Sequence, residues 1–424
     1  MKIKLLLHFV LFLWCTNLFS QESYGRKIVK ELASDKYYGR GFIFDGDKKA
    51  ANFIQRVFIK NGVQSFENNS TGYFQYFKIS PNVFPKPVKL KINGKTLRLG
   101  YEYLVDAASK TTKGSYDLVE LDVSKIDTTQ FAEILNDKKY ADAFIFINEE
   151  ETIEKLSPTG YKKLIDILKS EGRHCGTVIN SKQKLLWRTL TYQIDRPMFY
   201  LKDWQGIPEK IEVSLVSEHR KNYSTQNVCG FIPGTSGKDS SIVITAHYDH
   251  IGAIGKKVVF NGANDNASGT ALMLYLSQYF KNYPPKYNIV FLAFSAEESG
   301  LLGSIHFAQN PLIDLSKIKF LLNLDMAGTG DDGIQVVNGT IFKSEFDRLV
   351  HINKEMKYLP NVLIRGAMNR SDHFPFYEKG VPCFFIYTLG GISAYHDVYD
   401  VYDTLPFTNF SNYAKLLINY IETF

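Results

Sequence analysis

The chain has 424 residues, which is enough for more than one hydrophobic core. Hydrophobic residues make up 45% of the sequence and charged residues 22%, proportions that are ordinary for a soluble globular protein. The 50 lysine and arginine residues exceed the 44 aspartate and glutamate residues by six, but no basic stripe or base-stacking module accompanies this excess. We therefore expect no nucleic-acid partner.

Residues 1–20 are typical of an export signal. Lys2 and Lys4 form a short basic start, and an apolar run follows from Leu5 to Trp14. A run of this length is too short to span a bilayer comfortably and suits a cleaved signal peptide, with an uncleaved membrane anchor as the alternative. No later stretch is long and apolar enough to cross a membrane. We expect export to the periplasm or the extracellular space, without stable membrane insertion after signal cleavage.

Three cysteines follow this segment, namely Cys175, Cys229 and Cys383. Their odd number and wide spacing predict neither a disulfide framework nor a CxxC metal site. Because Cys229 and Cys383 lie in apolar, strand-like runs, we expect both to be small buried side chains of the core.

The pattern of apolar residues changes along the chain. Residues 26–62 have helical spacing, interrupted by a loop signal at Gly39-Arg40-Gly41. Residues 85–215 contain short β-like runs and one helical stretch near Tyr161–Ser170, which predicts a small β-rich domain with few helices. That region has no cluster of histidines, cysteines or carboxylates that would indicate chemistry of its own.

From Val228 onward, strand-like runs alternate with helical patterns. The segments are 241–246, 267–280, 288–295, 318–324, 346–357, 381–387 and 410–423. This alternation predicts an α/β fold with a mixed, mostly parallel sheet covered by helices on both faces. The predicted organisation is a first part of the main domain at 21–84, an inserted β-rich domain at 85–215 and the rest of the main domain at 216–424.

Four clusters of acidic residues and histidines stand out in the main domain. They are His247-Tyr-Asp249-His250, Asp265 in an Asn/Gly loop, Glu297-Glu298, and Asp325. Three of the four follow predicted strands, where open α/β sheets place their sites. Asp265 instead precedes a predicted helix, in a loop whose glycines allow the backbone to approach a site closely. Imidazole and carboxylate ligands together suit zinc.

The residue types suggest a role for each side chain. Two metal ions about 3.5–4 Å apart are most simply joined by a carboxylate, and Asp265 is our choice for this bridge. Adjacent residues leaving a strand point apart, so we assign Glu298 as a metal ligand and Glu297 as the general base. Asp249 follows His247 by two residues and faces the same way, so it is predicted to orient the imidazole.

The remaining ligand is expected to be a histidine near the C-terminus. His351, His373 and His396 are the candidates. His396 follows an apolar run and a Gly-Gly turn, and we prefer it as the ligand. His373 is then expected to line the site or support a ligand, whereas His250 and His306 are interpreted as structural residues.

Together these residues resemble the family of secreted aminopeptidases that hold a co-catalytic pair of zinc ions. Glutamate carboxypeptidase, the transferrin receptor and glutaminyl cyclase are related to that family. The resemblance is strong over residues 225–405 and weaker over 26–62, where Leu32-Ala-Ser-Asp-x-x-x-Gly-Arg40-Gly is similar to the segment that opens the peptidase domain. It implies the zinc-exopeptidase fold, and residues 85–215 are similar in place to a protease-associated domain.

The resemblance also implies two sets of zinc ligands. One zinc ion would be held by His247, Asp265 and Asp325, and the other by Asp265, Glu298 and His396. Glu297 would act as the base and Asp249 as the orienting carboxylate. The family usually has an Asp-Thr pair shortly after its last histidine ligand; here Asp400 lies at about that distance, while the Asp-Thr pair itself, Asp403-Thr404, lies farther on.

The expected function is hydrolysis of N-terminal residues from peptides with two zinc ions per chain. A single-zinc glutaminyl cyclase and a carboxypeptidase for acidic substrates are alternatives on the same fold. The carboxypeptidase would require arginines around the pocket, for which Arg365 and Arg370 are the nearby candidates. A non-catalytic binding module is a further alternative, although such a module would be expected to lack some of the ligands that are present here.

Overall fold

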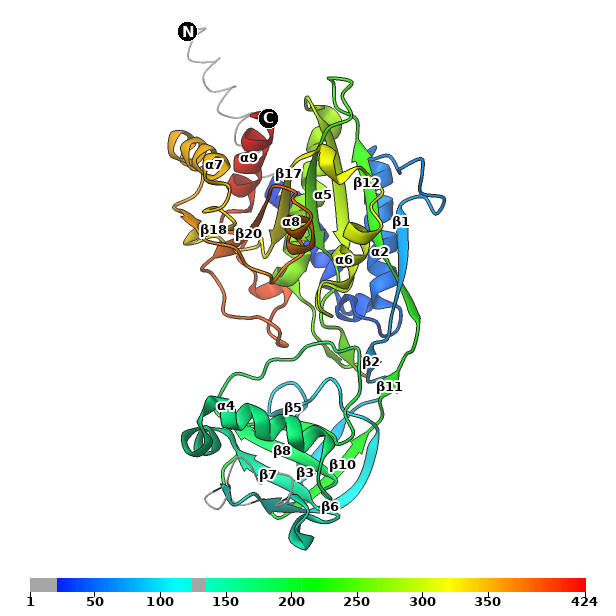
Figure 1. Ribbon diagram of the computed structural model, residues 1–424, viewed down its shortest axis with the longest axis vertical. Helices are drawn as coiled ribbons and strands as arrows, with labels where there is room; N and C mark the ends of the chain where they lie inside the picture. The colour runs from blue at the N-terminus through cyan, green and yellow to red at the C-terminus, as the bar shows by residue number, and fades with distance from the viewer. Residues whose placement is uncertain (1–20, 124–134, 207) are drawn as a thin grey trace, which may run out of the picture.

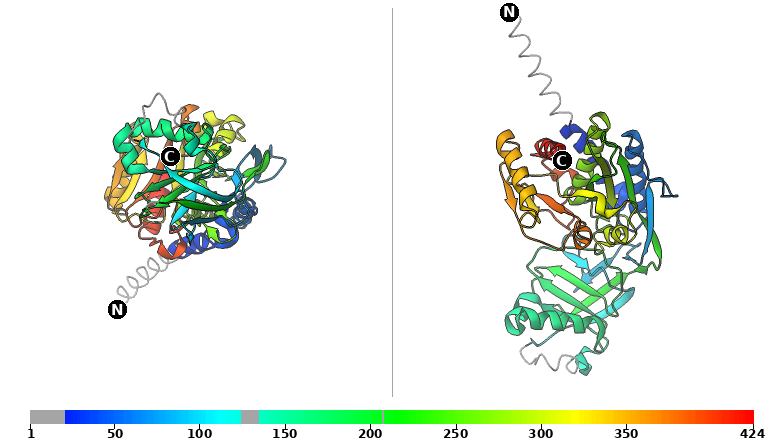
Figure 2. Two further views of the ribbon diagram at one scale, coloured as in Figure 1. Left: turned by 90° about the horizontal axis from the view of Figure 1, so that it is seen from below. Right: turned by 45° about the horizontal axis from the view of Figure 1, so that its top comes forward.

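The computed structural model describes residues 21–123, 135–206 and 208–424, so the predicted export signal lies outside it. The described chain forms two lobes, each built on an eight-stranded sheet. The upper lobe in Figure 1 contains the beginning and the end of the described chain, and the lower lobe contains its middle part. The tilted view on the right of Figure 2 shows the same division.

The sheet of the upper lobe has the strand order β1-β12-β16-β13-β17-β20-β18-β19. Its inner strands β16, β13, β17 and β20 pair in parallel, whereas β1 and β12 on one side and β18 on the other pair antiparallel to their inner neighbours. The strands are β1 Phe74–Ile79, β12 Tyr223–Ile232, β13 Ser241–His247, β16 Asn288–Phe294, β17 Ile318–Asp325, β18 Gly333–Val337, β19 Val362–Ile364 and β20 Cys383–Leu389.

Alternate residues of the central strands face opposite sides of this sheet. On β13, Ile242 and Ile244 pack in a core that includes residues of helices α2, α5 and α9, while Val243 packs in a second core with Phe307 of α6 and Phe376 of α8. The helices are α2 Gly46–Lys60, α5 Gly269–Asn282, α6 Leu302–Gln309, α7 Lys343–Met356, α8 Phe374–Glu378 and α9 Phe410–Glu422. The predicted fold, a mixed sheet between helices, is therefore confirmed.

The N-terminal segment is helical in two pieces, as its apolar spacing predicts. Residues 21–32 and α2 are helices, and the turn η1, Asp35–Arg40, lies between them. The Gly39-Arg40-Gly41 loop signal falls at the end of this turn. Gly39 has a φ of 58°, and a β-carbon there would lie 2.2 Å from the carbonyl oxygen of Phe260. Glycine is needed here because two segments of backbone meet.

The lower lobe is β-rich with one long helix. Its sheet has the order β4-β3-β10-β6-β7-β8-β9-β5, and the helix α4, Glu149–Ser170, follows β7. These strands are β3 Lys89–Ile92, β4 Lys95–Thr96, β5 Tyr103–Val105, β6 Thr112–Glu120, β7 Phe144–Asn148, β8 Gly176–Ser181, β9 Met198–Lys202 and β10 Lys210–Leu215. The short strands β2, Asn82–Val83, and β11, Glu218–His219, pair antiparallel where the chain enters and leaves this lobe.

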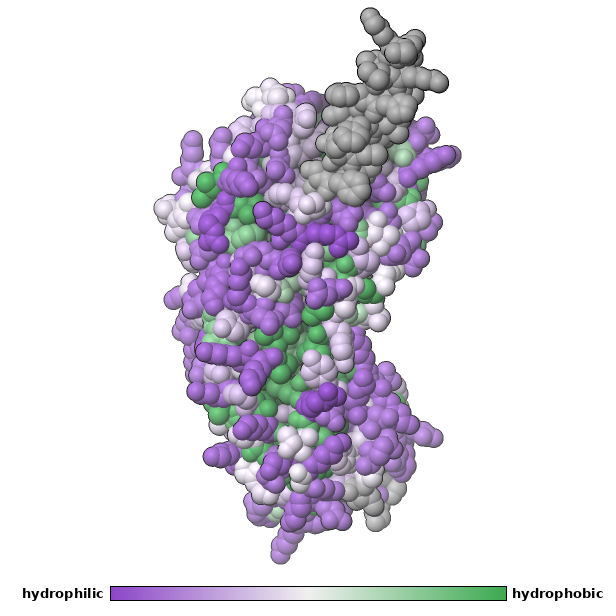
Figure 3. All heavy atoms as spheres, turned by 180° about the vertical axis from the view of Figure 1, so that it is seen from behind, coloured by the Kyte–Doolittle hydropathy of each residue, from purple (hydrophilic) through white to green (hydrophobic). Residues whose placement is uncertain are grey.

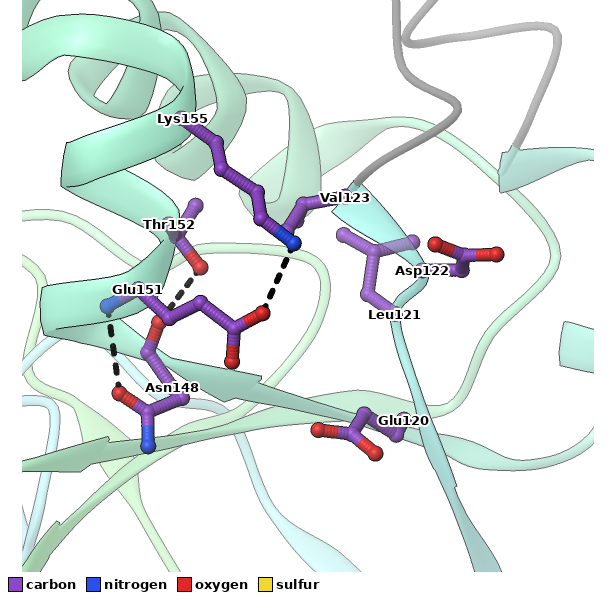
Figure 4. Close-up of a pocket in the computed structure, with 8 residues that line it drawn as sticks. All are labelled: Glu120, Leu121, Asp122, Val123, Asn148, Glu151, Thr152 and Lys155. Carbon is purple, nitrogen blue, oxygen red and sulfur yellow. Dashed lines mark hydrogen bonds and ion pairs between the residues drawn. The ribbon is translucent and has the colours of Figure 1, made fainter.

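A pocket of about 220 Å³ lies beside the start of α4 (Figure 4). Its polar side chains serve the helix itself: the Asn148 side chain accepts a hydrogen bond from the Glu151 main-chain N–H, and Lys155 pairs with Glu151 at 2.9 Å. An asparagine cap and an ion pair four residues apart both stabilise a helix. We therefore attribute these polar groups to the stability of α4.

Most of the surface is polar, but apolar side chains gather near the middle of the face opposite to that in Figure 1 (Figure 3). Among the described residues, no helix combines the length and the apolar character needed to span a bilayer. Cys229 and Cys383 are fully buried with free thiols, so their predicted place in the core is confirmed.

Candidate metal centre

The acidic and histidine clusters come together at the carboxyl ends of the parallel strands. His247 is the last residue of β13 and Asp325 the last residue of β17. Glu297 and Glu298 follow β16, and His396 lies in the loop after β20. Parallel strands end at the same edge of a sheet, so four separate chain segments deliver their polar side chains to one place.

Three of these segments hold a non-glycine residue in the left-handed region of backbone conformation. The φ angles are 61° at Ala296, 46° at Met326 and 51° at His396. Such residues are uncommon, and they cluster where the surrounding structure must aim a side chain at a functional site. Each of these three segments turns sharply at the point where its polar side chain enters the site.

Asp265 lies between the two histidines and directs one carboxylate oxygen to each. Its Oδ1 is 3.4 Å from Nε2 of His247, and its Oδ2 is 3.1 Å from Nε2 of His396. His247 Nε2 is also 3.4 Å from Asp325 Oδ1, and His396 Nε2 is 3.1 Å from Glu298 Oε2. Each histidine nitrogen therefore faces one oxygen of Asp265 and one oxygen of a further carboxylate.

These spacings fit a metal ion in each group. Ligand atoms about 2.0–2.2 Å from a tetrahedral zinc ion lie about 3.3–3.6 Å from one another. Nitrogen and oxygen donors of this kind are also the ligands that zinc accepts. Asp325 Oδ1 is buried and accepts no hydrogen bond from the described residues, which leaves its lone pairs available to a cation. Two groups of the described residues could each hold a metal ion, and zinc suits their donors: His250, Asp265, Glu298 and His396, and His247, Glu297 and Asp325.

The carboxylates are crowded in a way that requires positive charge nearby. A cavity of about 170 Å³ is lined by Asp265, Glu297, Glu298 and Asp325. Burial raises the pKa of Glu297 well above its ordinary value, and the charges of Asp372 and Glu298 add to this effect although His247 opposes it. Buried like charges destabilise one another unless a cation or a proton offsets them.

His247 responds to the same charges in the opposite direction. Burial alone would lower its pKa, but the carboxylates of Glu297, Asp325 and Asp265 raise the pKa well above its ordinary value. A cluster that draws protons so strongly is also one that attracts metal cations.

Asp249 is fully buried and lies against both the His247 ring and the turn that carries the two glutamates. Its Oδ1 lies 3.8 Å from Nδ1 of His247, whereas that nitrogen lies 3.2 Å from the main-chain oxygen of Asp249. The carboxylate instead accepts hydrogen bonds from the main-chain N–H groups of Glu297, at 3.1 Å, and Glu298, at 3.3 Å. The Asp249 carboxylate thus fixes the turn that carries both glutamates, and its predicted role in orienting the imidazole stays a prediction.

His250, interpreted from the sequence as structural, lies in the same cluster. Its Nδ1 is 2.8 Å from Glu298 Oε1 and 3.9 Å from Asp265 Oδ2, and its ring is fully buried. Glu298 thus has one oxygen against His250 and the other against His396. The position of His250 three residues after His247, just past a strand end, was the sequence signal for its place in the site.

The loop that carries Asp265 is tied to the turn after β17 by its polar neighbours. The Asn266 side chain accepts from the main-chain N–H of Met326, that of Asn264 accepts from Gly328, and the Ser268 hydroxyl accepts from Ala327. These three bonds place Asp265 beside Asp325. The sequence identified the loop, but it gave no indication of these partners.

Asp400 supports Asp265 from the other side. Its carboxylate is fully buried and accepts from the main-chain N–H groups of Asn264, at 2.8 Å, and Asp265, at 3.0 Å. Asp403, which belongs to the Asp-Thr pair in the sequence, is exposed. Asp400 is therefore the aspartate that contacts the metal centre after His396.

The Arg40 side chain binds the main chain of the loop that carries Asp265. Its side chain is fully buried and donates five hydrogen bonds to main-chain carbonyls. The acceptors are Leu32, Tyr248, Asn261, Gly262 and Asp265. All five N–H groups of a guanidinium are thus used, and they join the N-terminal segment to the loops that present His247 and Asp265. Burial lowers the pKa of Arg40 to about 10.

The other C-terminal histidines lie elsewhere. His351 is exposed on α7. His373 is fully buried with its ring stacked on Phe385 at 5.3 Å, and it is not among the residues that line the cavity. His373 therefore does not line this cavity, and its other predicted role, the support of a ligand, stays a prediction. Its neighbour Ser371 has its hydroxyl 3.4 Å from Asp325 Oδ2 instead.

Comparison with known proteins points to a peptidase. Residues 227–421 match the profile of peptidase family M28. The chain is 30% identical over 216 residues to "Aminopeptidase YwaD" of Bacillus subtilis (strain 168). The aligned residues are 48% of this chain and 46% of that protein. It is also 35% identical over 111 residues to a "Probable zinc metalloprotease" of Pyrenophora tritici-repentis (strain Pt-1C-BFP). These residues are 25% of this chain and 23% of that protein. The matched segments span half or less of these relatives.

Solved structures match over a much larger share of the chain. BSAP, a zinc aminopeptidase from Bacillus subtilis, superposes with a TM-score of 0.68 at 18% identity and covers 95% of this chain and 94% of that chain. An aminopeptidase from Aneurinibacillus sp. strain AM-1 gives a TM-score of 0.64 at 18% identity, with 96% and 94% covered. At these identities the likeness shows a shared fold. The segment 227–421, which matches peptidase family M28, contains all the acidic and histidine side chains that meet at the candidate metal centre.

Proposed function

We propose that the chain is an exported aminopeptidase that uses two zinc ions to remove residues from the N-termini of peptides. One observation carries the two-metal assignment: Asp265 directs one oxygen to each of two histidine–carboxylate groups. In this proposal one zinc ion is held by His247, Asp265 and Asp325, and the other by Asp265, Glu298 and His396. The M28 match and the aminopeptidase relative support the reaction class.

When bound, the zinc ions supply Lewis acidity, which polarises the scissile carbonyl and acidifies the attacking water. Glu297 takes the proton of that water on its carboxylate and delivers it to the leaving amine. Burial and the neighbouring carboxylates raise the pKa of Glu297 above its ordinary value, which favours its acceptance of the proton. Asp249 holds the turn on which Glu297 stands through two main-chain hydrogen bonds.

The small cavity supports removal of one residue at a time. Beyond the carboxylates it is lined by Met326, Met368, Phe385 and Tyr387, which would surround an apolar side chain. The free α-amine of a substrate is a cation and would be stabilised beside Glu298 and Asp265. We therefore expect an apolar N-terminal residue to be preferred over a charged one.

We also propose the domain organisation given by the sequence, with residues 85–215 as a protease-associated-like insertion between residues 21–84 and 216–424. The separate sheets of the two lobes support this division. Export of the chain rests on the pattern of residues 1–20 alone.

A carboxypeptidase is the second candidate, because Arg370 lines the cavity and an arginine there could pair with a substrate carboxylate. Arg365 is engaged instead, donating to the hydroxyl of Tyr387 at 2.8 Å. Peptides with an acetylated N-terminus separate the two functions: an aminopeptidase does not cleave them, whereas a carboxypeptidase does.

Removing the metal is expected to abolish hydrolysis of leucine amide and to lower the thermal midpoint of the chain. The reason is that the crowded carboxylates repel one another once no cation offsets their charge, and that a ligand which binds only the folded state stabilises it. The measurement is amide hydrolysis and differential scanning calorimetry after dialysis against a chelator.

Dialysis against the same chelator saturated with zinc serves as the control and should change neither quantity. Adding zinc back to the stripped chain should restore both. Full hydrolysis by a chain from which all zinc has been removed would refute the proposed function.

A further inference from the structure

A second cavity adjoins the metal centre on the side of the lower lobe. Its volume is about 440 Å³, within the range of about 300–1,000 Å³ that is usual for ligand pockets. His396 lines both this cavity and the smaller one that holds the carboxylates. Every other lining residue belongs to the segment 105–200, which is the predicted inserted domain. A proposed zinc ligand therefore stands between the two cavities.

The wall of this cavity is a segment of the inserted domain, Gln183–Arg188, that is fixed against the loop of His396. The main-chain N–H of Trp187 donates to the carbonyl of His396 at 2.9 Å. Lys184 pairs with Asp397 at 2.6 Å and donates to the carbonyl of Ser393 at 2.7 Å. The segment is therefore held in place from both lobes, and the cavity is preformed.

Trp187 anchors the segment at its centre. The side chain is 6% exposed, and its indole N–H donates to the carbonyl of Val105 at 2.9 Å. The ring stacks on Phe260 of the upper lobe at 4.9 Å. The neighbouring Leu186, by contrast, is 54% exposed although it lines the cavity. An exposed apolar side chain beside a buried aromatic anchor offers a surface for an apolar ligand group.

Arg188 is the charged residue of this cavity that remains available. Asp106 accepts from the Tyr200 hydroxyl at 3.1 Å, Glu149 accepts from Tyr161 at 2.9 Å, and Lys184 is paired with Asp397. Arg188 forms no ion pair with any residue that the structure describes. The cavity thus combines an apolar wall with one free guanidinium, a group suited to a carboxylate.

We propose that this cavity binds the part of a short peptide that lies beyond the cleaved bond, with an apolar side chain against Leu186 and the C-terminal carboxylate beside Arg188. The inference rests on the proposed function, because the peptide must place its N-terminal residue at the metal centre. It adds a substrate class: short peptides with a free C-terminus and an apolar residue near it. The inserted domain then provides a binding surface for the substrate.

A cycle of two substrates and two proteins tests the role of Arg188. The substrates are Leu-Gly-Phe and its C-terminal amide, and the proteins are the full zinc-loaded chain and its Arg188→Gln variant. With the unmodified chain, kcat/KM should be about three- to fivefold lower for the amide than for Leu-Gly-Phe, because the amide lacks the carboxylate that pairs with Arg188. The difference, which is the size expected of a partly exposed ion pair, should lie mostly in KM. In Arg188→Gln the two substrates should be hydrolysed with the same kcat/KM.

The matched control is Arg173→Gln, which changes an exposed arginine of the same lobe that does not line the cavity. In Arg173→Gln, kcat/KM should differ between the two substrates by the same factor as in the unmodified chain. An equal effect of amidation in Arg188→Gln and in the unmodified chain would overturn the inference while leaving the aminopeptidase function in place. If the unmodified chain hydrolysed neither peptide nor leucine amide, the proposed function would fail and the inference with it.

A second pair of variants tests the apolar wall. Leu186→Ser should lower the ratio of kcat/KM for Leu-Gly-Phe to that for Leu-Gly-Gly by about fivefold or more, because the phenyl ring loses its apolar contact. Leu363→Ser, at a leucine that is 44% exposed and lies outside the cavity, should leave the ratio unchanged. An unchanged ratio in Leu186→Ser would exclude this wall from substrate binding.

Discussion

Replacing Glu297 with glutamine is expected to lower kcat for leucine amide by about a thousandfold or more, while the zinc content of the chain stays the same. Glutamine keeps the size and shape of the side chain but cannot take a proton from the attacking water or pass one to the leaving amine. General acid–base groups contribute about 10²- to 10⁴-fold, and this residue serves both steps. The measurements are kcat and zinc per chain from elemental analysis.

Two further variants separate this role from others. Glu298→Gln should lose zinc as well as activity, because Glu298 provides an oxygen at 3.1 Å from the His396 nitrogen in one of the two groups. Glu378→Gln, at an exposed glutamate on α8, should behave like the unmodified chain. Glu297→Gln with ordinary turnover would remove Glu297 from the mechanism.

Replacing Arg40 with methionine is expected to lower the free energy of unfolding by about 4 kcal/mol or more. The change removes all five hydrogen bonds of a fully buried guanidinium, and loss of such a buried network is one of the few causes of so large an effect. Zinc affinity should fall as well, because two of these bonds hold the carbonyls of Gly262 and Asp265. Denaturant unfolding and chelator competition measure the two effects.

Arg40→Lys should recover only part of this loss, because an ammonium has three donors and lacks the flat fork that reaches all five carbonyls. Arg56→Met, at an exposed arginine on α2, is the control and should change the unfolding free energy by about 0.5 kcal/mol or less. A value for Arg40→Met within about 1 kcal/mol of the unmodified chain would contradict the bracing role.

The order of strands and helices in the main domain could be predicted because burial imposes a period on each of them. Ile242, Val243 and Ile244 alternate between two helix-covered faces, so a continuous apolar run predicts a buried strand. The polar residues that follow such runs, His247 and Asp325 among them, then lie at one edge of a parallel sheet. That rule is sufficient to bring the principal side chains of the metal centre together without knowledge of their distances.

The supporting contacts could not be predicted, because they join residues that are far apart in the chain through main-chain groups. The carboxylate of Asp249 receives the N–H groups of Glu297 and Glu298, and Arg40 reaches carbonyls more than 200 residues away. Main-chain donors and acceptors are the same at every position, so no residue type indicates which of them will be chosen.

His250 shows a different limit. It was interpreted from the sequence as a structural residue, yet its Nδ1 lies 2.8 Å from Glu298 Oε1. The reason is the turn after β13, which brings the third residue past the strand end back toward the cluster. Backbone direction in a turn depends on tertiary contacts, here the approach of Gly252 to Gly39 and Gly41, more than on the residues of the turn itself.

The central claim is that five side chains from distant parts of the chain hold two metal ions with Asp265 between them. Anomalous diffraction at the zinc edge from crystals of the zinc-loaded chain tests it most directly. We predict two peaks about 3.5–4 Å apart, one beside His247 and Asp325 and the other beside Glu298 and His396, with one oxygen of Asp265 on each. A single peak, as a single-zinc glutaminyl cyclase would give, or two peaks not joined by Asp265, would contradict the claim.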